Sequence, residues 1–449
     1  MERFLSGPAA TLYPRLILAA LSVGLGGPTA AQAQDRFPGD QSLRERVPEL
    51  ARTVCEAGIE APPVPGATRL SSDTFRGPQA QGEVVDWRVD DDVTLRVSRL
   101  VEAGQGRQMY FVDLYAPGAD LTVPRPVVRG VIAGNCRFLG GRAVIYGAGT
   151  DSPLALERLG PDMRPSEPPM QLNPAVPAGA ANPGCLRVAV LDNGVNYTLP
   201  AFEGRLARRD DGTLIGHDYW EDDDRPFDFG YPPQGLDPRL SAFSPRHHGT
   251  GVASVLMAEA PAQACLGIYR YVPAPVPGRD LDVSKILDDM ARDGIRVVNV
   301  SSGRQQPWPE FEKAIAAHPD ILFVFAAGND GADLQARPYY PASYEAANVV
   351  VVAAADDRGQ LWDRSNRGPV DVAAPAVDVR AQVADGSERP LTGTSIAAPR
   401  VAALAARLMA ASPGMTAAAA KEGIAMLAQT SGVVADGIPV LTDEVLQPR

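Results

Sequence analysis

The sequence lacks the excess of positive charge that is typical of proteins that bind nucleic acid or anionic membranes. It also lacks, after residue 33, the long apolar runs that are typical of membrane-spanning proteins. Its 42 lysine and arginine residues are outnumbered by 54 aspartate and glutamate residues, which gives a net charge of −12 over 449 residues. This balance argues against nucleic acid or an anionic membrane surface as the main partner. After residue 33, no apolar run approaches the roughly 20 residues that span a bilayer. We therefore expect no nucleic acid partner and no stable membrane insertion of the mature chain.

The N-terminus carries a short apolar run with the features of a targeting signal. Residues 1–33 combine Arg3 and Arg15, an apolar stretch over 16–27 and the small-residue motif Ala31-Gln32-Ala33. This is the pattern of a secretory signal peptide that is removed by cleavage. A membrane anchor is the alternative, but the apolar stretch is too short to span a bilayer. We expect a protein that is secreted or periplasmic, in an oxidising compartment.

Cysteine is scarce and widely spaced. The sequence has four cysteines and no Cys-x-x-Cys pair, which disfavours a zinc site. In an exported protein four cysteines allow three disulfide pairings, and buried free thiols are the alternative. We favour the pairing that keeps each bridge within one half of the chain, Cys55–Cys136 and Cys185–Cys265.

A proline-rich stretch over residues 161–184 divides the remaining chain. Its composition and weak apolar periodicity predict an extended linker. Residues 35–160 carry no catalytic motif, but they alternate apolar and polar residues in several runs, which predicts a small, mostly β N-terminal domain. These runs lie at 93–104, 108–117 and 136–149.

Residues 185–449 have the pattern of an α/β domain. Nearly continuous apolar runs alternate with helical patterns, as expected of parallel strands buried on both faces. This predicts a doubly wound, mostly parallel sheet with functional residues beyond the carboxyl ends of its strands. The predicted strands lie within 185–192, 264–272, 295–303, 321–330 and 348–356, and the predicted helices within 251–260, 282–294 and 308–318.

Histidine is also scarce, and its order along the chain limits the chemistry. The four histidines all precede Ser395, and the last of them is His318. If Ser395 is a nucleophile, its base must come from upstream in the sequence. This excludes the Ser-Asp-His order of α/β-hydrolases and favours the order Asp-His-Ser.

Candidate site residues occupy the ends of the predicted strands and helices. Asp192 ends the first strand, where it either orients an imidazole or caps a turn. His248 precedes a helix and is the candidate base, with His247 as its competitor. Asn329 ends another strand and either donates to an oxyanion or forms a turn. Ser395 begins an alanine-rich helix, as a nucleophile or as an ordinary helix cap.

The motifs around these residues resemble the subtilisin-like serine peptidase family. Five of them occur in the order of the family, and the resemblance covers residues 185 to 430. They are "VAVLDNGV" (188–195), "HGTGVAS" (248–254), "VVNVSSG" (297–303), "AAGND" (326–330) and "GTSIAAPRVAALAA" (393–406).

The resemblance implies a subtilisin-like fold and an exported serine endopeptidase. Asp192 would orient the base, His248 would act as general base and acid, and Ser395 would form the acyl-enzyme. Asn329 and the backbone N–H of Ser395 would form the oxyanion hole. Ser301, Ser302 and Gly303 would pair with the backbone of a polypeptide substrate by β-addition.

No organic cofactor is required for this chemistry. The carboxylates clustered over 221–228 are candidate ligands for a structural calcium ion, but they lack the spacing of a known calcium loop and favour a solvated turn. Tyr339 and Tyr340 indicate a partly filled specificity pocket that suits small side chains.

Several residues differ from those usual in the family, but none of the changes removes a catalytic group. The differing residues are Asn193, His247, Gly251, Ala376 and Ile396. Two alternatives remain beside the active endopeptidase. One is a catalytically silent scaffold that binds peptides. The other is a self-processing protease whose N-terminal domain, removed or retained, is the functional binding module.

Overall fold

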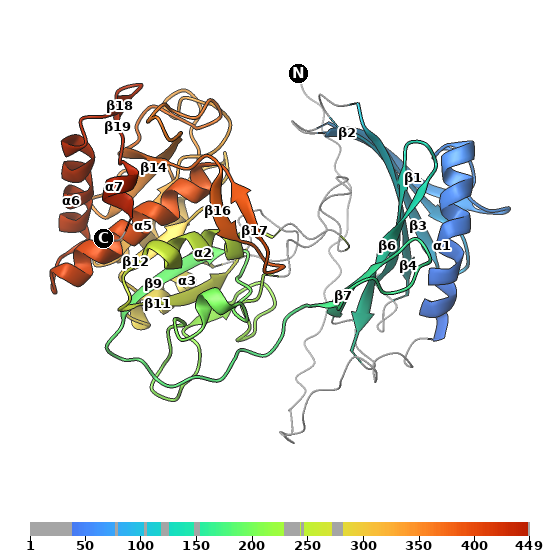
Figure 1. Ribbon diagram of the computed structural model, residues 1–449, viewed down its shortest axis with the longest axis horizontal. Coiled ribbons are helices and arrows are strands. Elements are labelled where there is room, and N and C mark those ends of the chain that lie inside the picture. Colours follow the sequence, from blue (N-terminus) through green and yellow to red (C-terminus); the bar gives the residue numbers. More distant parts are fainter. Residues whose placement is uncertain are drawn as a thin grey trace.

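The computed structural model describes residues 38–76, 80–102, 106–117, 125–147, 153–228, 243, 247–271 and 282–447. These residues form an N-terminal region with one antiparallel sheet and a C-terminal α/β region (Figure 1). The predicted signal peptide, residues 1–33, lies outside the described residues. None of the helices in the described ranges has the length and apolar character needed to cross a membrane.

The N-terminal region consists of helix α1 (Pro38–Ala57) and an eight-stranded sheet. The buried side chains Leu43, Val47, Leu50 and Val54 repeat at helical spacing, so they form one apolar face that packs on the sheet. Each strand pairs antiparallel with the next in sequence. The strands are β1 (Thr68–Arg76), β2 (Ala80–Arg88), β3 (Thr94–Glu102), β4 (Gln108–Ala116), β5 (Arg125–Ala133), β6 (Phe138–Tyr146), β7 (Pro153–Leu159) and β8 (Met170–Gln171).

The α/β region is built on a seven-stranded parallel sheet, which confirms the predicted fold class. Its strand order is β10-β11-β9-β12-β13-β14-β15. The strands are β9 (Leu186–Asp192), β10 (Gly216–Asp218), β11 (Ala264–Arg270), β12 (Val297–Val300), β13 (Leu322–Ala326), β14 (Val349–Ala355) and β15 (Val372–Pro375).

Helices cover both faces of this sheet. Val188 and Val190 pack with α2, α5, α6 and α7, whereas the alternate residues Ala189 and Leu191 pack with α3 and α4. The helices are α2 (Gly249–Glu259), α3 (Val283–Arg292), α4 (Pro309–Ala317), α5 (Thr394–Ala411), α6 (Ala417–Thr430) and α7 (Asp443–Leu446). Two small hairpins complete the region, β16 (Val379–Gln382) with β17 (Glu388–Leu391) and β18 (Val434–Ala435) with β19 (Ile438–Pro439).

The strand order reverses at the centre of the sheet. From β9 the chain first adds β10 and β11 on one side and then β12, β13 and β14 on the other. In such sheets ligands bind beyond the carboxyl ends of the strands, where the order reverses. The topology therefore brings Asp192, Ser301 and Asn329 to the carboxyl end of the sheet, where parallel strands all end on the same side.

Both predicted disulfides are present. Cys55 near the end of α1 is bonded to Cys136 in the β5–β6 turn, and Cys185 before β9 is bonded to Cys265 in β11. Each bridge therefore stays within one region, as predicted.

The predicted linker over 161–184 is bound at both of its ends. Strand β8 lies within it and pairs with β7 of the N-terminal sheet. Farther along, the backbone oxygen of Pro174 accepts from Tyr197 and that of Pro177 accepts from Arg208. The domain boundaries themselves stay a prediction.

Candidate active site

The buried Asp192 and the half-buried His248 form a pair at the carboxyl end of the parallel sheet. Asp192 is the last residue of β9, and His248 immediately precedes α2. Nδ1 of His248 lies 2.9 and 3.0 Å from the two carboxylate oxygens of Asp192, which is only 1% exposed. An ionised carboxylate only accepts hydrogen bonds, so Nδ1 carries the proton and Nε2 is the basic nitrogen. This is the orientation that a general base needs.

Asn193 joins the turn after β9 to the start of α2. Its Oδ1 accepts a 2.7 Å hydrogen bond from the backbone N–H of Gly249, which follows His248. Its backbone oxygen accepts from Nε of Arg270, whose Nη1 lies 2.6 Å from the fully buried Asp218. Asn193, which differs from the residue usual in the family, thus fixes the positions of Asp192 and His248 relative to each other.

His247 forms a second histidine–aspartate pair beside the first. Its Nδ1 lies 2.8 Å from the backbone oxygen of Asp228 and 3.2 Å from Oδ1 of the same residue. Burial opposes the charged imidazole, but the hydrogen bond and the charge of Asp228 raise the pKa of His247 above its ordinary value. Asp228 also accepts from the backbone N–H and hydroxyl of Thr250 and so caps α2. Of the two neighbouring histidines, His248 is the one held by Asp192.

Ser395 lies in the first turn of α5, where it exchanges hydrogen bonds with Ser301. The Ser395 hydroxyl donates to the backbone oxygen of Ser301 at 3.1 Å, and the Ser301 hydroxyl donates to the backbone oxygen of Ser395 at 3.0 Å. Ser301 follows β12 and is buried. Its side chain therefore holds the start of α5, while the half-buried Ser302 and Gly303 lie farther along the same segment.

Asn329 is held beside the start of α5 by Thr394. The backbone N–H and the hydroxyl of Thr394 both donate to Oδ1 of Asn329 at 2.9 Å. The amide oxygen is thus occupied, and Nδ2 remains as the donor end of the side chain. Gly393 has a φ of 138°, and a Cβ there would lie 3.3 Å from Nδ2. Glycine therefore keeps the space in front of this donor open.

Two residues that the sequence analysis did not single out support this arrangement. Thr394 is fully buried, and its hydroxyl also accepts from the backbone N–H of Gly328. Asn366 donates to the backbone oxygen of Ala327 and accepts from Asp330 and Ala332, so it fixes the turn that carries Asn329. Both lie in motifs visible in the sequence, "GTS" (393–395) and "SNRG" (365–368).

Tyr339 lies between two segments of the site. A Cβ on Gly303 would be 2.7 Å from its Cε1, and a Cβ on Gly328 would be 3.1 Å from its Cδ1. Burial raises the pKa of the Tyr339 hydroxyl to about 12. The neighbouring Tyr340 exchanges backbone hydrogen bonds of 2.7 and 2.8 Å with Arg304. The Tyr339 ring therefore occupies the space beside Gly303 and Gly328.

In the acidic segment over 221–228, residues 221–225 lie at the surface or are half-buried, whereas residues 226–228 are buried. Asp218 accepts from the backbone N–H groups of Trp220 and Glu221, and its own N–H pairs with the backbone oxygen of Asp223. Asp222 and Asp224 are exposed. Within the described ranges, no group of three or more His, Cys, Asp or Glu residues is arranged to hold a metal ion. The calcium hypothesis stays a prediction.

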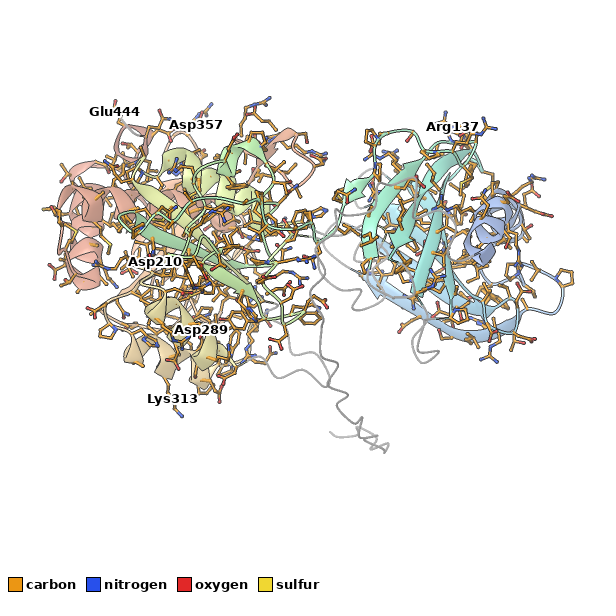
Figure 2. The ribbon with its side chains drawn as sticks, turned by 90° about the horizontal axis from the view of Figure 1, so that it is seen from below. Arg137, Asp210, Asp289, Lys313, Asp357 and Glu444 are labelled. Carbon is orange, nitrogen blue, oxygen red and sulfur yellow. A yellow bond between two sulfur atoms is a disulfide. The ribbon has the colours of Figure 1, made fainter. Side chains whose placement is uncertain are left out.

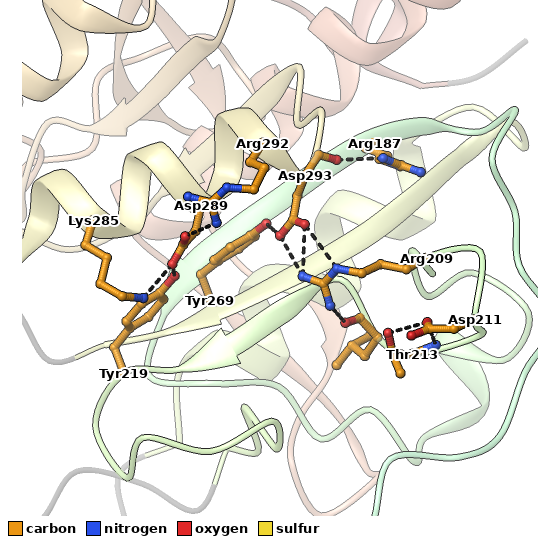
Figure 3. Close-up of polar contacts among 11 residues, drawn as sticks. Arg187, Arg209, Asp211, Thr213, Tyr219, Tyr269, Lys285, Asp289, Arg292 and Asp293 are labelled. Carbon is orange, nitrogen blue, oxygen red and sulfur yellow. Dashed lines mark hydrogen bonds and ion pairs between the residues drawn. The ribbon is translucent and has the colours of Figure 1, made fainter.

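A separate pocket of about 610 Å³ lies beside α3, and none of the predicted site residues is among those lining it. Burial would raise the pKa of Asp289, but hydrogen bonds from Lys285, Tyr219 and Arg292 lower it to about 2. Asp293 in turn accepts from Arg209 and Tyr269 (Figure 3). These carboxylates are neutralised by their own neighbours, so the cluster joins α3 to the sheet and to the Arg209 turn.

The C-terminal region matches proteins of one family. The profile of the subtilase family matches residues 186–438. The chain is 33% identical over 235 residues to the "Thermophilic serine proteinase" of Bacillus sp. (strain AK1), covering 49% of this chain and 51% of that protein. It is 30% identical over 177 residues to "Subtilisin Savinase" of Lederbergia lenta, covering 37% and 64% of the two chains. The chain therefore spans about half the length of the first of these relatives.

The crystal structure of a cold adapted subtilisin-like serine proteinase aligns with 59% of this chain and 91% of its own, at 23% identity and a TM-score of 0.44. The family match begins in β9, ends in β19 and covers more than half of the 449 residues. It contains Asp192, His248, Asn329 and Ser395, in the order predicted from the sequence. The chain belongs to the subtilase family.

Proposed function

We propose that this protein is an exported serine endopeptidase that cleaves polypeptides through an acyl-enzyme. The observation that carries the proposal is the Asp192–His248 pair, in which Nδ1 is bound to the carboxylate, so that the role of base falls to Nε2. The N-terminus of α5 places Ser395 among backbone N–H groups that favour developing negative charge. Asn329, oriented by Thr394, supplies a further donor.

In the proposed reaction, Nε2 of His248 takes the proton of the Ser395 hydroxyl as Oγ attacks the carbonyl carbon. The hydroxyl must first leave its hydrogen bond to Ser301. The resulting oxyanion accepts from Nδ2 of Asn329 and from the backbone N–H of Ser395. His248 then gives its proton to the leaving amine, and the peptide bond breaks. A water molecule, deprotonated by the same nitrogen, attacks the acyl carbon. The bond from that carbon to Oγ breaks, His248 returns the proton to Oγ, and the acyl group leaves as a carboxylic acid.

The substrate is a polypeptide bound in an extended conformation. Ser302 and Gly303 would offer backbone groups for β-addition. Because the Tyr339 ring fills the space beside Gly303 and Gly328, we expect a shallow pocket that prefers small side chains. Apart from water and the substrate, every step uses groups of the chain itself, so we propose no cofactor requirement. A structural calcium ion is tested separately, by asking whether a chelator changes the melting temperature.

Export to the periplasm or the medium is part of the proposal. It rests on the signal-like residues 1–33 and on the two disulfides, which persist in oxidising compartments.

Turnover of a fluorogenic peptide library tests the proposed activity. We expect the wild type to cleave peptides with small side chains and Ser395→Ala to lose this activity. Ser412→Ala is the matched control, because Ser412 caps the other end of α5. Equal activity of the wild type and Ser395→Ala would refute the endopeptidase proposal. A folded wild type that cleaves none of the peptides would instead favour the silent scaffold.

A further inference from the structure

A row of charged residues crosses the N-terminal sheet. Each member lies directly opposite the next on the neighbouring strand, so all of them share one face. The row runs from β2 to β7 and contains two aspartates and four arginines. Its members are Asp86, Arg96, Asp113, Arg129, Arg142 and Arg158.

This row lies on the face of the sheet that α1 does not cover. Gly130 faces α1, because a Cβ there would lie 2.4 Å from Val47 of that helix. Arg129 is its neighbour in β5, so it points to the opposite face. Figures 1 and 2 both show α1 on the side of the sheet away from the α/β region. The charged row therefore faces the α/β region.

Hydrogen bonds pair two of the arginines with the two aspartates. Arg96 binds Asp86 through two hydrogen bonds of 2.8 and 3.0 Å. Arg129 binds Asp113 through two hydrogen bonds of 2.6 Å, and both residues are at most 1% exposed. A buried ion pair of this kind requires a cover that keeps water away.

Phe243 of the α/β region provides part of that cover. Its side chain is 0% exposed, and the Arg129 guanidinium lies 5.5 Å from the centre of its ring. The Phe243 ring also packs edge-on against the ring of Tyr115, with 6.2 Å between the two ring centres. It belongs to an apolar cluster with Val144, Tyr146 and Leu156 of the sheet and with Leu172, which follows β8. Such a setting combines apolar burial with a cation–π contact.

The backbone of Phe243 is recognised as well. Nη1 of Arg142, the next arginine in the row, donates a 2.7 Å hydrogen bond to the backbone oxygen of Phe243. Burial lowers the pKa of Arg142, but this guanidinium keeps its charge at physiological pH. The sheet thus contacts both an aromatic side chain and the peptide group that carries it.

We propose that the face of the N-terminal sheet that α1 does not cover is a binding site for a peptide segment with an aromatic side chain. In this chain Phe243 occupies the site. Phe243 precedes His247 by four residues. This binding connects the N-terminal region to the part of the sequence that precedes His247. The N-terminal region would accordingly remain associated after the connecting segment is cut.

The test uses the full chain with Ser395→Ala and a specific cleavage sequence inserted between Glu167 and Pro168, which are both exposed. Strand β8 stays on the C-terminal fragment and pairs with β7 in every variant, so the variants are compared with wild type by the dissociation constant of the two fragments. The chain is cut with the matching protease, and the fragments are passed over a gel-filtration column. We expect the wild-type fragments to elute together. With Phe243→Ala the dissociation constant should rise about 30-fold or more, because the change removes a buried aromatic anchor. The variant fragments should then elute together only at a correspondingly higher concentration than the wild-type fragments.

Two arginine variants distinguish the specific hydrogen bond from Arg142 to Phe243 from the general effect of removing one positive charge from the row. Arg142→Met should weaken the association, whereas Arg158→Met should not, because Arg158 is bound to Glu167 at the exposed end of the row. Circular dichroism of each uncut chain checks that it is folded.

The proposal is overturned if the wild-type fragments separate, or if the folded Phe243→Ala fragments associate as tightly as wild type. It is also overturned if the uncut chain is a dimer that Phe243→Ala converts to a monomer, because the segment would then come from a second copy. The experiment measures association alone, so its outcome is independent of the proposed peptidase activity.

Discussion

Thr394 donates two hydrogen bonds to a single atom, Oδ1 of Asn329, from its backbone N–H and from its hydroxyl, both at 2.9 Å. The same hydroxyl accepts from the backbone N–H of Gly328. One residue thus fixes the orientation of the amide that we propose as an oxyanion donor, and it immediately precedes the proposed nucleophile.

Variants of Thr394 test this relationship. Thr394→Val removes the hydroxyl, so Asn329 loses one bond and the buried N–H of Gly328 loses its acceptor. We expect kcat to fall while KM stays nearly constant, because the donor acts in the transition state. Thr394→Ser keeps the hydroxyl and should retain most activity. Asn329→Ala should lower kcat by about 10²- to 10³-fold, the loss known for one oxyanion-hole donor. An unchanged kcat in Asn329→Ala would contradict its role.

Asn193 should contribute to both stability and activity. Asn193→Ala leaves the buried N–H of Gly249 without its acceptor, which typically costs about 1–3 kcal/mol. We expect lower stability toward denaturant and a lower kcat, because the hydrogen bond that links the segment after Asp192 to the segment after His248 is lost. Asn135→Ala is the matched control, since Asn135 accepts a similar bond in an exposed turn. Equal unfolding free energies for the two variants would argue against a stabilising role of the Asn193–Gly249 hydrogen bond.

The raised pKa of His247 predicts a pH-dependent contribution to stability. Asp228 and Asp385 both favour the charged imidazole. Their stabilisation is fully present below the ordinary histidine pKa of about 6.5 and is lost as the pH rises through the raised pKa. The melting temperature of wild type should therefore exceed that of His247→Gln most at acid pH, and the difference should shrink with rising pH. A difference that is constant across this range would show that the pair does not stabilise the charged form.

Tyr339 should determine the size of the side chain accepted next to the cleaved bond. Tyr339→Gly removes the ring beside Gly303 and Gly328, so kcat/KM for peptides with phenylalanine there should rise relative to alanine. Tyr339→Phe keeps the ring and should keep the wild-type preference. The preference is measured with paired peptides that differ only at this position. If Tyr339→Gly has the wild-type ratio, the ring does not line the pocket.

The two disulfides should stabilise the chain to a similar extent. They close loops with sequence separations of 81 and 80 residues, so each is expected to contribute about 2–4 kcal/mol by restricting the unfolded chain. Urea unfolding of Cys55→Ser/Cys136→Ser and of Cys185→Ser/Cys265→Ser measures this. Wild-type stability in either double variant would contradict the expectation for that bridge.

The sequence predicts where the candidate site residues lie in the fold, because they are found at the ends of predicted strands. Asp192 and Asn329 each end or closely follow an unbroken apolar run, and parallel strands bring such positions to one edge of a sheet. The choice of His248 over His247 also agrees with the placement of Asp192 beside His248. In this part of the chain, local pattern and topology determine which residues meet.

Other features depend on contacts between distant segments, which no local pattern reveals. Thr394 and Asn329 are separated by 65 residues, and Phe243 meets Arg142 across 101. Neither Thr394 nor Phe243 differs in type from many ordinary core residues. Helix α1 was not predicted, although Leu43, Val47 and Leu50 repeat at helical spacing; Pro48 within it is a residue that normally disrupts helices.

Labelling with a fluorophosphonate probe tests the central claim most directly, because the probe reacts with a serine that a neighbouring base activates. Peptide mass mapping of the labelled protein should locate the probe on Ser395 in wild type. Labelling should be lost in Ser395→Ala and His248→Ala and should persist in His247→Ala. Labelling that survives in His248→Ala but vanishes in His247→Ala, or no labelling of folded wild type, would contradict the Asp192–His248–Ser395 assignment.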